Sequence, residues 1–534
     1  METLAADLAT MIRTPLHDSH VRALDKAGTR RHLEAGDVLQ EMGKHVEEFH
    51  YLISGEVEAI DPRTHDRYGD GATLGPGQFF GDISFLSGAK ALLGARAVKD
   101  TELICVPRDD MLRLMSQIPE MSDIIITVFA ARRRRLLESG EASLTIIGAE
   151  QSRDIRNMAA FASRNRIPFR SLTLGEHEAE ALAHECSLGE AQPAVIFGKS
   201  EVVTDPTPRG LARRLGLDVD VSKEDDFDVL IVGGGPAGVA AGVYAGAEGM
   251  RALVIENHTI GGQAGTSSRI ENYMGFPTGI SGGDLCWRGE VQAMKFGTKF
   301  AVPRRAVAVE KRDDGVFCVT MDDGDIVCAK AIVVATGVQY RRLPIDRLED
   351  FEGIGVYYAA TEAEARFCAE TEAVVIGGGN SAGQAAMYLS RTAKHVHILV
   401  RGTSLATSMS DYLLSRLEAD PAITIHYRTE LTGLHGDDAL EKVTIRDKAA
   451  GQDWTVNSRA VFVMVGAAPN TDWLTGLVDL DDKGFVVTGD GGHETSHPGI
   501  FAVGDVRSGS VKRVASAVGE GSVVISKVWG HVHA

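Results

Sequence analysis

The sequence predicts a multidomain protein in which a small β-roll is followed by three α/β domains. Three observations lead to this prediction. The chain has 534 residues, several times the usual size of one domain. Short strand-like runs broken by glycine turns fill residues 30–106. From residue 226 onward the chain is rich in glycine and valine, and it contains two units of a buried strand, a glycine-rich loop and a helix.

The composition is that of an ordinary soluble globular protein, with 44% hydrophobic and 24% charged residues. Acidic residues outnumber basic ones by 74 to 55, a net charge of −19, so the general attraction to nucleic-acid phosphates is missing. Uncharged apolar stretches such as 124–131 are too short to span a membrane, and no secretory signal opens the chain. We therefore expect neither a nucleic-acid nor a membrane partner.

The cysteines give no sign of a disulfide framework or a zinc ribbon. All six are widely spaced, without a CxxC or CxxxC pair, so we expect a reduced, cytoplasmic protein. The string HETSH at 493–497 matches a zinc-protease motif, but the glycines and proline around it indicate a loop instead of the required helix. His395 and His397 alternate on a predicted strand and are interpreted as ordinary strand residues. We expect no metal site.

The first predicted domain covers residues 1–140. Its β-roll is followed by a helix over 121–137 that carries four consecutive arginines, 132–135. Such a run can bind an anion, but at a helix end it is more often a solvated face that favours the helix dipole, and we adopt that interpretation.

Residues 141–220 alternate strands and helices in the order βαβαβ followed by a last helix, with Pro193 just before a strand. This order resembles the thioredoxin/glutaredoxin fold. In that family a CxxC lies between the first strand and helix, whereas here the turn reads GAEQSRDIR. Thiol exchange at this turn is excluded because only a thiolate attacks a disulfide. We interpret the segment as a docking or spacer domain, joined to the rest by the charged stretch 221–228.

The first glycine loop, DVLIVGGGPAG at 228–238, follows a buried-strand pattern and opens a helix. Gly233 suits a tight turn, Gly235 allows backbone amides to approach a pyrophosphate, and Gly238 lets the helix pack on the strand. The helix N-terminus attracts the anion. Glu256 lies 23 residues after Gly233, the spacing of an acid that binds ribose hydroxyls.

The second loop, AVVIGGGNSA at 373–382, repeats the arrangement with Gly377, Gly379 and Ala382. The equivalent of the acid is Val400, followed by Arg401. A carboxylate would repel a ribose 2′-phosphate, whereas a guanidinium pairs with it. The first Rossmann-like unit should therefore bind an ADP-ribose moiety without a 2′-phosphate, and the second should prefer NADPH.

Residues 226–534 resemble the low-molecular-weight thioredoxin reductases. The matching text is GGQ at 261–263, ENYMGFP from 271, ATG at 335–337, VGAAPNT from 465 and GIFAVGDV from 499. The resemblance implies FAD and NADPH as cofactors, a homodimer, and an FAD domain formed by 221–346 and 466–534 around an NADPH domain, 347–465. The residues it assigns to FAD are Gly233, Gly235, Pro236, Ala237, Gly238, Glu256, Gly262, Gln263, Asn272, Thr336, Gly337, Gly504, Asp505, Arg513, Val514 and Ala515. Those assigned to NADPH are Gly377, Gly379, Asn380, Ser381, Ala382 and Arg401.

The redox-active CxxC of that family is missing. Ala359, Ala360, Thr361 and Glu362 occupy its place, and Cys368 stands alone several residues later. Reduced flavin therefore has no resident dithiol to reduce. We favour an NADPH-dependent flavoprotein reductase that passes electrons to a small-molecule or small-protein acceptor and is regulated through its N-terminal domain. Two alternatives stay open: a nucleotide-responsive signalling or scaffold flavoprotein, and a ferredoxin–NADP reductase-like activity. The chain ends soon after its last helix, which weakens the ferredoxin alternative.

The β-roll resembles a cyclic-nucleotide-binding domain, on the text LISGEVEAI and FFGDISFLSGAKALLGARAV. In that family an acid after Phe-Gly binds the ribose, and an arginine about nine residues later pairs with the cyclic phosphate. Here the acid is Asp82 and the arginine position is Ala91, a loss worth roughly 1.5–3 kcal/mol. A cyclic nucleotide is a candidate ligand, and its site comprises Gly81, Asp82, Ile83, Lys90 and Ala91.

Overall fold

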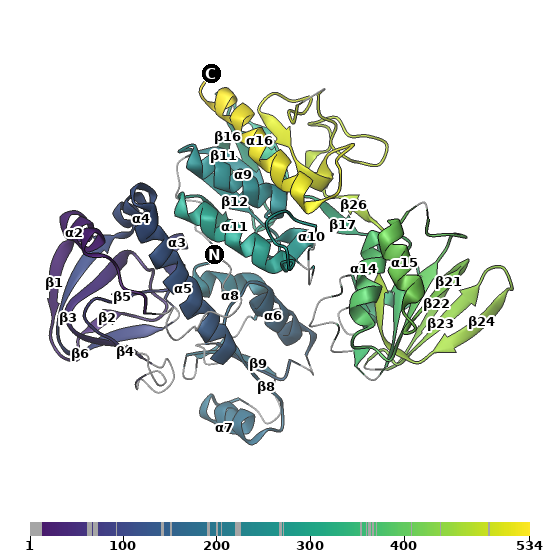
Figure 1. Ribbon diagram of the computed structural model, residues 1–534, viewed down its shortest axis with the longest axis horizontal. Coiled ribbons are helices and arrows are strands. Elements are labelled where there is room, and N and C mark those ends of the chain that lie inside the picture. Colours follow the sequence, from purple (N-terminus) through teal and green to yellow (C-terminus); the bar gives the residue numbers. More distant parts are fainter. Residues whose placement is uncertain are drawn as a thin grey trace.

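The computed structural model has four lobes, each built around its own β-sheet (Figure 1). It describes residues 13–534 except for 61–66, 68–72, 92, 140–143, 150–151, 189–192, 199–200, 204–205, 219–225, 266, 268–269, 271, 353–354, 359, 361–364, 366–367, 370, 407, 438 and 490–491. Within the described part of the chain, no helix is long and apolar enough to cross a membrane.

The N-terminal lobe is the predicted β-roll, a sheet in the order β1-β6-β3-β4 with β2 on β6 and β5 on β3. Its strands are β1 (Thr29–Leu33), β2 (Val38–Gln40), β3 (Glu48–Ile60), β4 (Thr73–Leu74), β5 (Phe79–Phe80) and β6 (Gly94–Pro107). Its helices are α2 (Asp18–Ala27), α3 (Ser84–Ser87), α4 (Arg108–Gln117) and α5 (Pro119–Ser139). Four buried phenylalanines fasten the helices to the sheet: Phe49, Phe79, Phe85 and Phe129.

The second lobe holds the sheet β10-β9-β7-β8, in which β7 and β8 are parallel and the other pairs are antiparallel. Its elements are β7 (Leu144–Ile147), α6 (Arg153–Arg164), β8 (Arg170–Leu172), α7 (His177–Glu185), β9 (Ala194–Phe197), β10 (Glu201–Val202) and α8 (Pro208–Leu215). Local signals fix the ends of α8: Thr207 caps the N–H of Gly210, and Gly216 ends the helix in the left-handed region.

The third lobe carries the sheet β13-β12-β11-β16-β15-β14, with β27 beside β16. Strand β11 lies between β12 and β16, all three parallel, so the chain reverses its winding direction there. The strands are β11 (Phe227–Val232), β12 (Ala252–Ile255), β13 (Lys299–Ala301), β14 (Ala306–Lys311), β15 (Phe317–Met321), β16 (Ile326–Val334) and β27 (Ile500–Ala502). The helices are α9 (Pro236–Ala247), α10 (Gly262–Gly265), α11 (Gly282–Lys295), the short η4 (Gly504–Val506) and α16 (Val514–Val532).

The fourth lobe has a parallel sheet, β18-β25-β19-β20-β21, and a three-stranded sheet, β22-β23-β24. Its elements are α12 (Leu348–Phe351), β18 (Val356–Tyr357), β19 (Glu372–Ile376), α14 (Asn380–Leu389), β20 (His395–Val400), α15 (Asp411–Ala419), β21 (Ile423–Tyr427), β22 (Thr429–His435), β23 (Lys442–Asp447), β24 (Gln452–Val456) and β25 (Ser458–Val463). A two-stranded ribbon, β17 (Val338–Tyr340) with β26 (Ala467–Pro469), joins it to the third lobe, and η3 (Asp472–Leu474) follows.

Two expectations from the sequence are wrong. Arg132 and Arg133 are not solvated, because both are engaged by the β-roll, and Arg133 is only 9% exposed. The cysteines are not all reduced, because Cys318 and Cys328 face each other on β15 and β16 and form a disulfide. Their separation of ten residues hid a cross-strand pair that only the hairpin register brings together. The expectation for 493–497 is confirmed, since this string lies in a loop.

Candidate nucleotide and redox site

The first glycine loop, between β11 and α9, has the geometry that its motif predicts. Gly233 has a φ of +112°, and a Cβ there would lie 2.3 Å from the carbonyl oxygen of Ala335. A Cβ on Gly238 would lie 1.8 Å from the oxygen of Gly233, so helix and loop touch backbone to backbone. By contrast, a Cβ on Gly235 would meet nothing within 4 Å. The loop is thus tight where it packs and open where a pyrophosphate would approach the start of α9.

Glu256 follows β12 and lies beside this loop. Its Oε2 accepts the N–H of Gly234 at 2.8 Å, and its Oε1 accepts the N–H of His258 at 2.9 Å. The carboxylate is therefore held at the carboxyl edge of the sheet, where the ribose of a dinucleotide would lie.

The other FAD residues taken from the resemblance come from four separate segments. Helix α10, with Gly262 and Gln263, packs against the loop, since a Cβ on Gly262 would lie 3.1 Å from the Cα of Gly235. Thr336 and Gly337 follow β16 and bind the backbone and side chain of Asn470. Gly504 and Asp505 follow β27, and Arg513, Val514 and Ala515 open α16. Pro236 and Ala237 begin α9. Asn272 is exposed in a loop, apart from the packed residues.

Asp505 is a half-buried acid of this cradle. Burial raises its pKa above the ordinary aspartate value, against the opposing effect of Lys512. Its neighbour Gly504 donates its N–H to Glu520 at 2.7 Å, and Glu520 also pairs with Arg507 at 2.7 Å. Since Glu520 is engaged by these two donors, Asp505 is the acid of this segment whose hydrogen-bonding capacity suits a cofactor hydroxyl.

The second glycine loop repeats these features between β19 and α14. Gly377 has a φ of +149°, and a Cβ there would lie 2.3 Å from the oxygen of Met464. A Cβ on Gly379 would meet only the oxygen of Ser408, at 3.9 Å. Asn380 accepts the N–H of Ser410 at 2.9 Å, Ser381 is exposed at the start of α14, and Ala382 is buried. Arg401 is exposed directly after β20, on the same sheet edge as the loop.

The dithiol position falls largely outside the described residues. Ala359, Thr361 and Glu362 are not described, and Ala360 packs beside the core of the fourth lobe. Cys368 is fully buried within that core. The disulfide Cys318–Cys328 lies elsewhere, near the start of β16. Six residues of strand, about 20 Å, separate Cys328 from the end of β16 at Val334, where the cradle begins.

In the β-roll, the polar groups of segment 80–91, here called the cassette, already have protein partners. Arg133 of α5 holds Asp82 at 2.7 Å and the Oγ of Ser84 at 2.7 Å. Arg132 donates to the oxygen of Gly81 at 2.8 Å. Lys90 donates its N–H to Leu215 and its Nζ to Arg213 at the end of α8. Ile83 and Ala91 are buried in the core of the lobe.

Sequence reasoning missed Arg133 as the partner of Asp82 and Asn470 as the partner of Thr336. The run of four arginines was a visible signal for the first. The second had no signal, because 134 residues separate the two side chains along the chain.

A family model for pyridine nucleotide-disulphide oxidoreductases matches residues 227–521, more than half of the chain. The chain belongs to this family. A model for the cyclic nucleotide-binding domain matches residues 30–118. The family resemblance inferred from the motifs is thus confirmed, as are the oxidoreductase class and the FAD and NADPH of the thioredoxin reductases.

Relatives match the C-terminal part of the chain. The thioredoxin reductase of Streptomyces clavuligerus is 35% identical over 298 residues, which cover 56% of this chain and 91% of the relative. The NADPH-dependent thioredoxin reductase 3 of Arabidopsis thaliana is 33% identical over 306 residues, 55% of this chain and 56% of the relative. The structure of Lactococcus lactis thioredoxin reductase in its FR conformation matches with a TM-score of 0.54 and 29% identity, covering 58% of this chain and 99% of that one. The crystal structure of T. acidophilum thioredoxin reductase has the same TM-score and identity, and the match covers 58% of this chain and 100% of that one.

Proposed function

We propose that this protein is an NADPH-dependent flavoprotein reductase that delivers electrons to an acceptor outside its own chain. The observation that carries the proposal is the pair of glycine loops, each open at its middle glycine and placed at the carboxyl edge of a parallel sheet. Glu256 on one sheet and Arg401 on the other suit two different nucleotides. The sequence has no CxxC, and the disulfide on β15 and β16 is too far from the cradle to accept electrons there directly.

The residues present fit the two cofactors. FAD would be held by the loop at Gly233–Gly238, by Glu256 at the ribose, and by Asp505 at the flavin side. NADPH would be held at Gly377–Ala382, with Arg401 on its 2′-phosphate. When bound, the flavin supplies the capacity to take a hydride from NADPH and release its electrons to a second substrate.

This chain's own residues provide the connection between the two cradles. The proposed FAD domain, 221–346 with 466–534, meets the proposed NADPH domain, 347–465, through the ribbon β17–β26. Gln263 of α10 donates its Nε2 hydrogen to the oxygen of Val338 in that ribbon at 3.1 Å. A rotation of one domain against the other would therefore act directly on the helix beside the flavin position, and such a movement could set the turnover rate.

Anaerobic mixing with NADPH tests the proposal. We expect the visible flavin absorption to bleach within seconds to minutes, and an acceptor to restore it. Dioxygen, quinones, ferredoxin and thioredoxin should then be compared by rate. Fast turnover with ferredoxin would favour the ferredoxin–NADP reductase alternative. A flavin band that NADPH leaves unchanged would contradict the proposal and favour the scaffold alternative.

The second lobe supports a docking role. Its sheet order, with one parallel pair at β7–β8 and antiparallel β9 and β10, agrees with a thioredoxin-like fold without the dithiol. Buried Arg304 of the third lobe pairs with Asp218 at 2.5 Å, and Arg209 pairs with Asp322 at 2.5 Å. On its other side α8 binds Lys90. The second lobe is therefore bound by ion pairs to the third lobe and by a hydrogen bond to the β-roll.

We propose that regulation passes from the cassette to the flavin side through α5 and α11. Val291 of α11 is buried in the core of the β-roll lobe, together with the cassette residue Phe85. Arg133 donates to the oxygen of Arg166 at 3.4 Å, and Arg166 pairs with Asp284 of α11 at 2.5 Å. Helix α11 in turn packs on α9 and α10, the helices beside the first loop.

A cyclic nucleotide at Gly81, Asp82, Ile83, Lys90 and Ala91 would have to displace Arg133 from Asp82. Binding and domain docking would then be linked reciprocally. Calorimetry with cyclic AMP and cyclic GMP should show tighter binding to Arg133→Ala than to the unaltered chain. Equal binding to both proteins would contradict this link. Sedimentation in the same buffers checks the homodimer that the family resemblance implies.

A further inference from the structure

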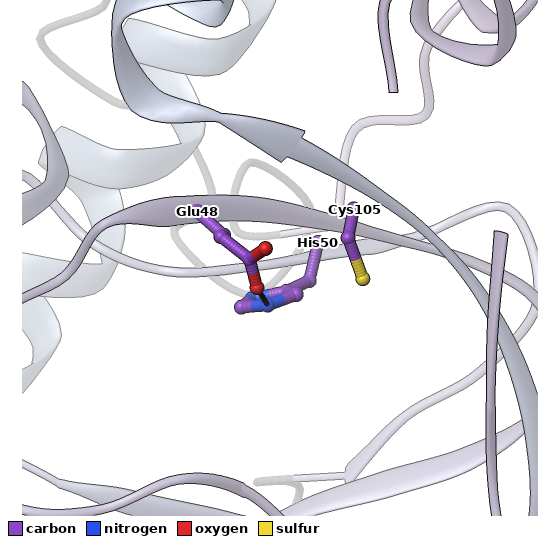
Figure 2. Close-up of side chains that lie close together, drawn as sticks. All are labelled: Glu48, His50 and Cys105. Atoms are coloured by element: carbon purple, nitrogen blue, oxygen red, sulfur yellow. Dashed lines mark hydrogen bonds and ion pairs between the residues drawn. The ribbon is translucent and has the colours of Figure 1, made fainter. Parts of the chain in front are cut away.

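A group of three different metal-binding side chains lies in the β-roll, away from both glycine loops. Glu48 and His50 come from β3, and Cys105 comes from β6 (Figure 2). His50 and Cys105 are directly paired across the two strands, and Glu48 is two residues from His50, on the same face. One oxygen, one nitrogen and the sulfur all lie within 4.8 Å of one another.

Two of these side chains are buried and the third is partly exposed. His50 is 4% and Cys105 is 1% exposed, whereas the side chain of Glu48 is 33% exposed. Imidazole and thiol at these depths are shielded from bulk water, and the carboxylate is the group in contact with solvent. Among the described residues, no other group of three or more histidine, cysteine or acidic side chains is gathered this closely.

The spacing of the histidine nitrogen and the carboxylate oxygen also fits two ligands of one tetrahedral ion. His50 Nε2 and Glu48 Oε2 are 3.3 Å apart, long for a charge-assisted hydrogen bond. Two ligands of one tetrahedral zinc ion, at about 2.0–2.2 Å from the metal, are about 3.4 Å from each other. Zinc at about 2.3 Å from sulfur needs a sulfur–nitrogen separation of about 3.6 Å, and the nitrogen and sulfur here lie within 4.8 Å of each other.

The charges also balance. A carboxylate and a thiolate neutralise a divalent ion, and histidine ligates as a neutral imidazole. A cysteine ligates zinc as the thiolate, so the Cys105 thiol gives up its proton when the metal binds.

We propose that Glu48, His50 and Cys105 form a zinc site in the β-roll. The ligands are Glu48 Oε2, His50 Nε2 and Cys105 Sγ, and a water molecule completes the tetrahedron. Binding releases the thiol proton to solvent and forms a zinc–thiolate bond. Because the ligands come from two neighbouring strands, the ion would cross-link β3 and β6.

Arg31 of β1 gives the proposal a sharp internal test. Its guanidinium donates to Glu48 Oε1 at 2.9 Å, so it competes with the ion for the charge of the same carboxylate. Removing it should tighten metal binding, whereas removing a ligand should abolish it. A purely structural Arg31–Glu48–His50 network would show no metal binding in either protein.

The experiment uses the full flavoprotein, freed of metal by a chelator, with its thiols kept reduced. Cobalt(II) is titrated anaerobically, and difference spectra against the metal-free protein remove the flavin absorption. We expect one equivalent of cobalt to give a sulfur-to-cobalt charge-transfer band and intense tetrahedral bands, and one equivalent of zinc to erase both.

Four variants complete the test. Cys105→Ser should lose the charge-transfer band, and Glu48→Gln should lose the bound equivalent of cobalt. Arg31→Gln should bind cobalt several-fold more tightly. Cys186→Ser, a free cysteine in another lobe, is the matched control and should behave as the unaltered chain. Far-ultraviolet circular dichroism and the thermal unfolding midpoint, compared with the unaltered chain, show that the β-roll of each variant is folded, and Glu48→Gln, at the exposed position, is the variant least expected to disturb folding. No cobalt band in the unaltered protein, or an unchanged band in Cys105→Ser, would overturn the proposal.

Discussion

The first glycine loop and the cassette of the β-roll both resemble nucleotide-binding segments in sequence, yet their surroundings differ. At Gly235 the protein leaves open space, and the carboxylate of Glu256 is held at the edge of the sheet. In the cassette, buried Arg133 already pairs with the carboxylate of Asp82, and Lys90 donates a hydrogen bond to the neighbouring lobe. The comparison teaches that a motif shows which groups are present, while the fold decides whether a ligand or the protein itself uses them.

The largest effect should come from forcing apart the tight packing of the first glycine loop on α9. In Gly238→Ala the new Cβ would be 1.8 Å from the oxygen of Gly233, and that backbone cannot yield cheaply. Overpacking of this kind costs about 3 kcal/mol or more, so FAD affinity should fall by at least about a hundredfold. Flavin content and reconstitution measure it. Gly235→Ala, whose Cβ has space, should fold normally and lose affinity only through the cofactor itself; equal folding defects in both variants would contradict the distinction.

Removing the ion pair between Arg133 and Asp82 should mainly destabilise the protein. Arg133→Ala leaves Asp82 without its partner at a site where both side chains are largely buried. Removing one member of such a pair costs about 3–5 kcal/mol, and the partly exposed setting here favours the lower end. Chemical denaturation followed by tryptophan fluorescence measures the loss. Arg22→Ala on the exposed face of α2 is the control, and a cost as small as that of the control would show that the cassette is not clamped.

A cavity of about 70 Å³ is lined by residues of the cassette and of helix α11. Glu290 and Trp287 of α11 and Arg133 of α5 lie in its wall. Burial raises the pKa of Glu290 to about 7, although Arg166 and Arg133 oppose the shift. The folded chain therefore holds this proton more tightly than the unfolded chain. The free energy of unfolding should fall as the pH rises from about 4.3 to 7, because the ionised carboxylate is disfavoured in the cavity.

Glu290→Gln removes that dependence. At pH 8 the variant should be more stable than the unaltered protein by about 1–3 kcal/mol, and at pH 5 the difference should nearly vanish. Denaturation at both pH values checks it. Neighbouring Asp284 is paired with Arg166 and its pKa is lowered, so it should not titrate in this range. A constant difference at the two pH values would contradict the assignment to Glu290.

The smallest effect is expected for a substitution at the second nucleotide-binding unit, where Arg401 would bind the 2′-phosphate. Arg401 is exposed, so a charge pair with the 2′-phosphate is screened by water. Arg401→Ala should lower kcat/KM for NADPH by about tenfold, or about 1.4 kcal/mol, and leave that for NADH nearly unchanged. Steady-state rates with the best acceptor measure the ratio. A parallel loss with both nucleotides would mean that Arg401 supports the fold instead of reading the phosphate.

Much of the architecture could be predicted from local patterns. The β-roll, the alternating lobe at 141–220 and both glycine loops are encoded by turns, caps and buried-strand runs that act over a few residues. The disulfide between Cys318 and Cys328 and the burial of Arg132 and Arg133 could not be predicted this way. Each depends on a partner that strand register or helix docking brings close from elsewhere in the chain.

The sequence by itself predicted the residues of the two cradles, because a glycine at a tight turn and an acid or arginine at a strand end act where they stand in the chain. Only the tertiary structure decided that Asp82 is paired with Arg133 of α5, that Lys90 binds the second lobe, and that Glu48 and His50 meet Cys105. The physical reason is that these contacts join side chains about 50 or more residues apart, whose distance is set by packing and not by spacing.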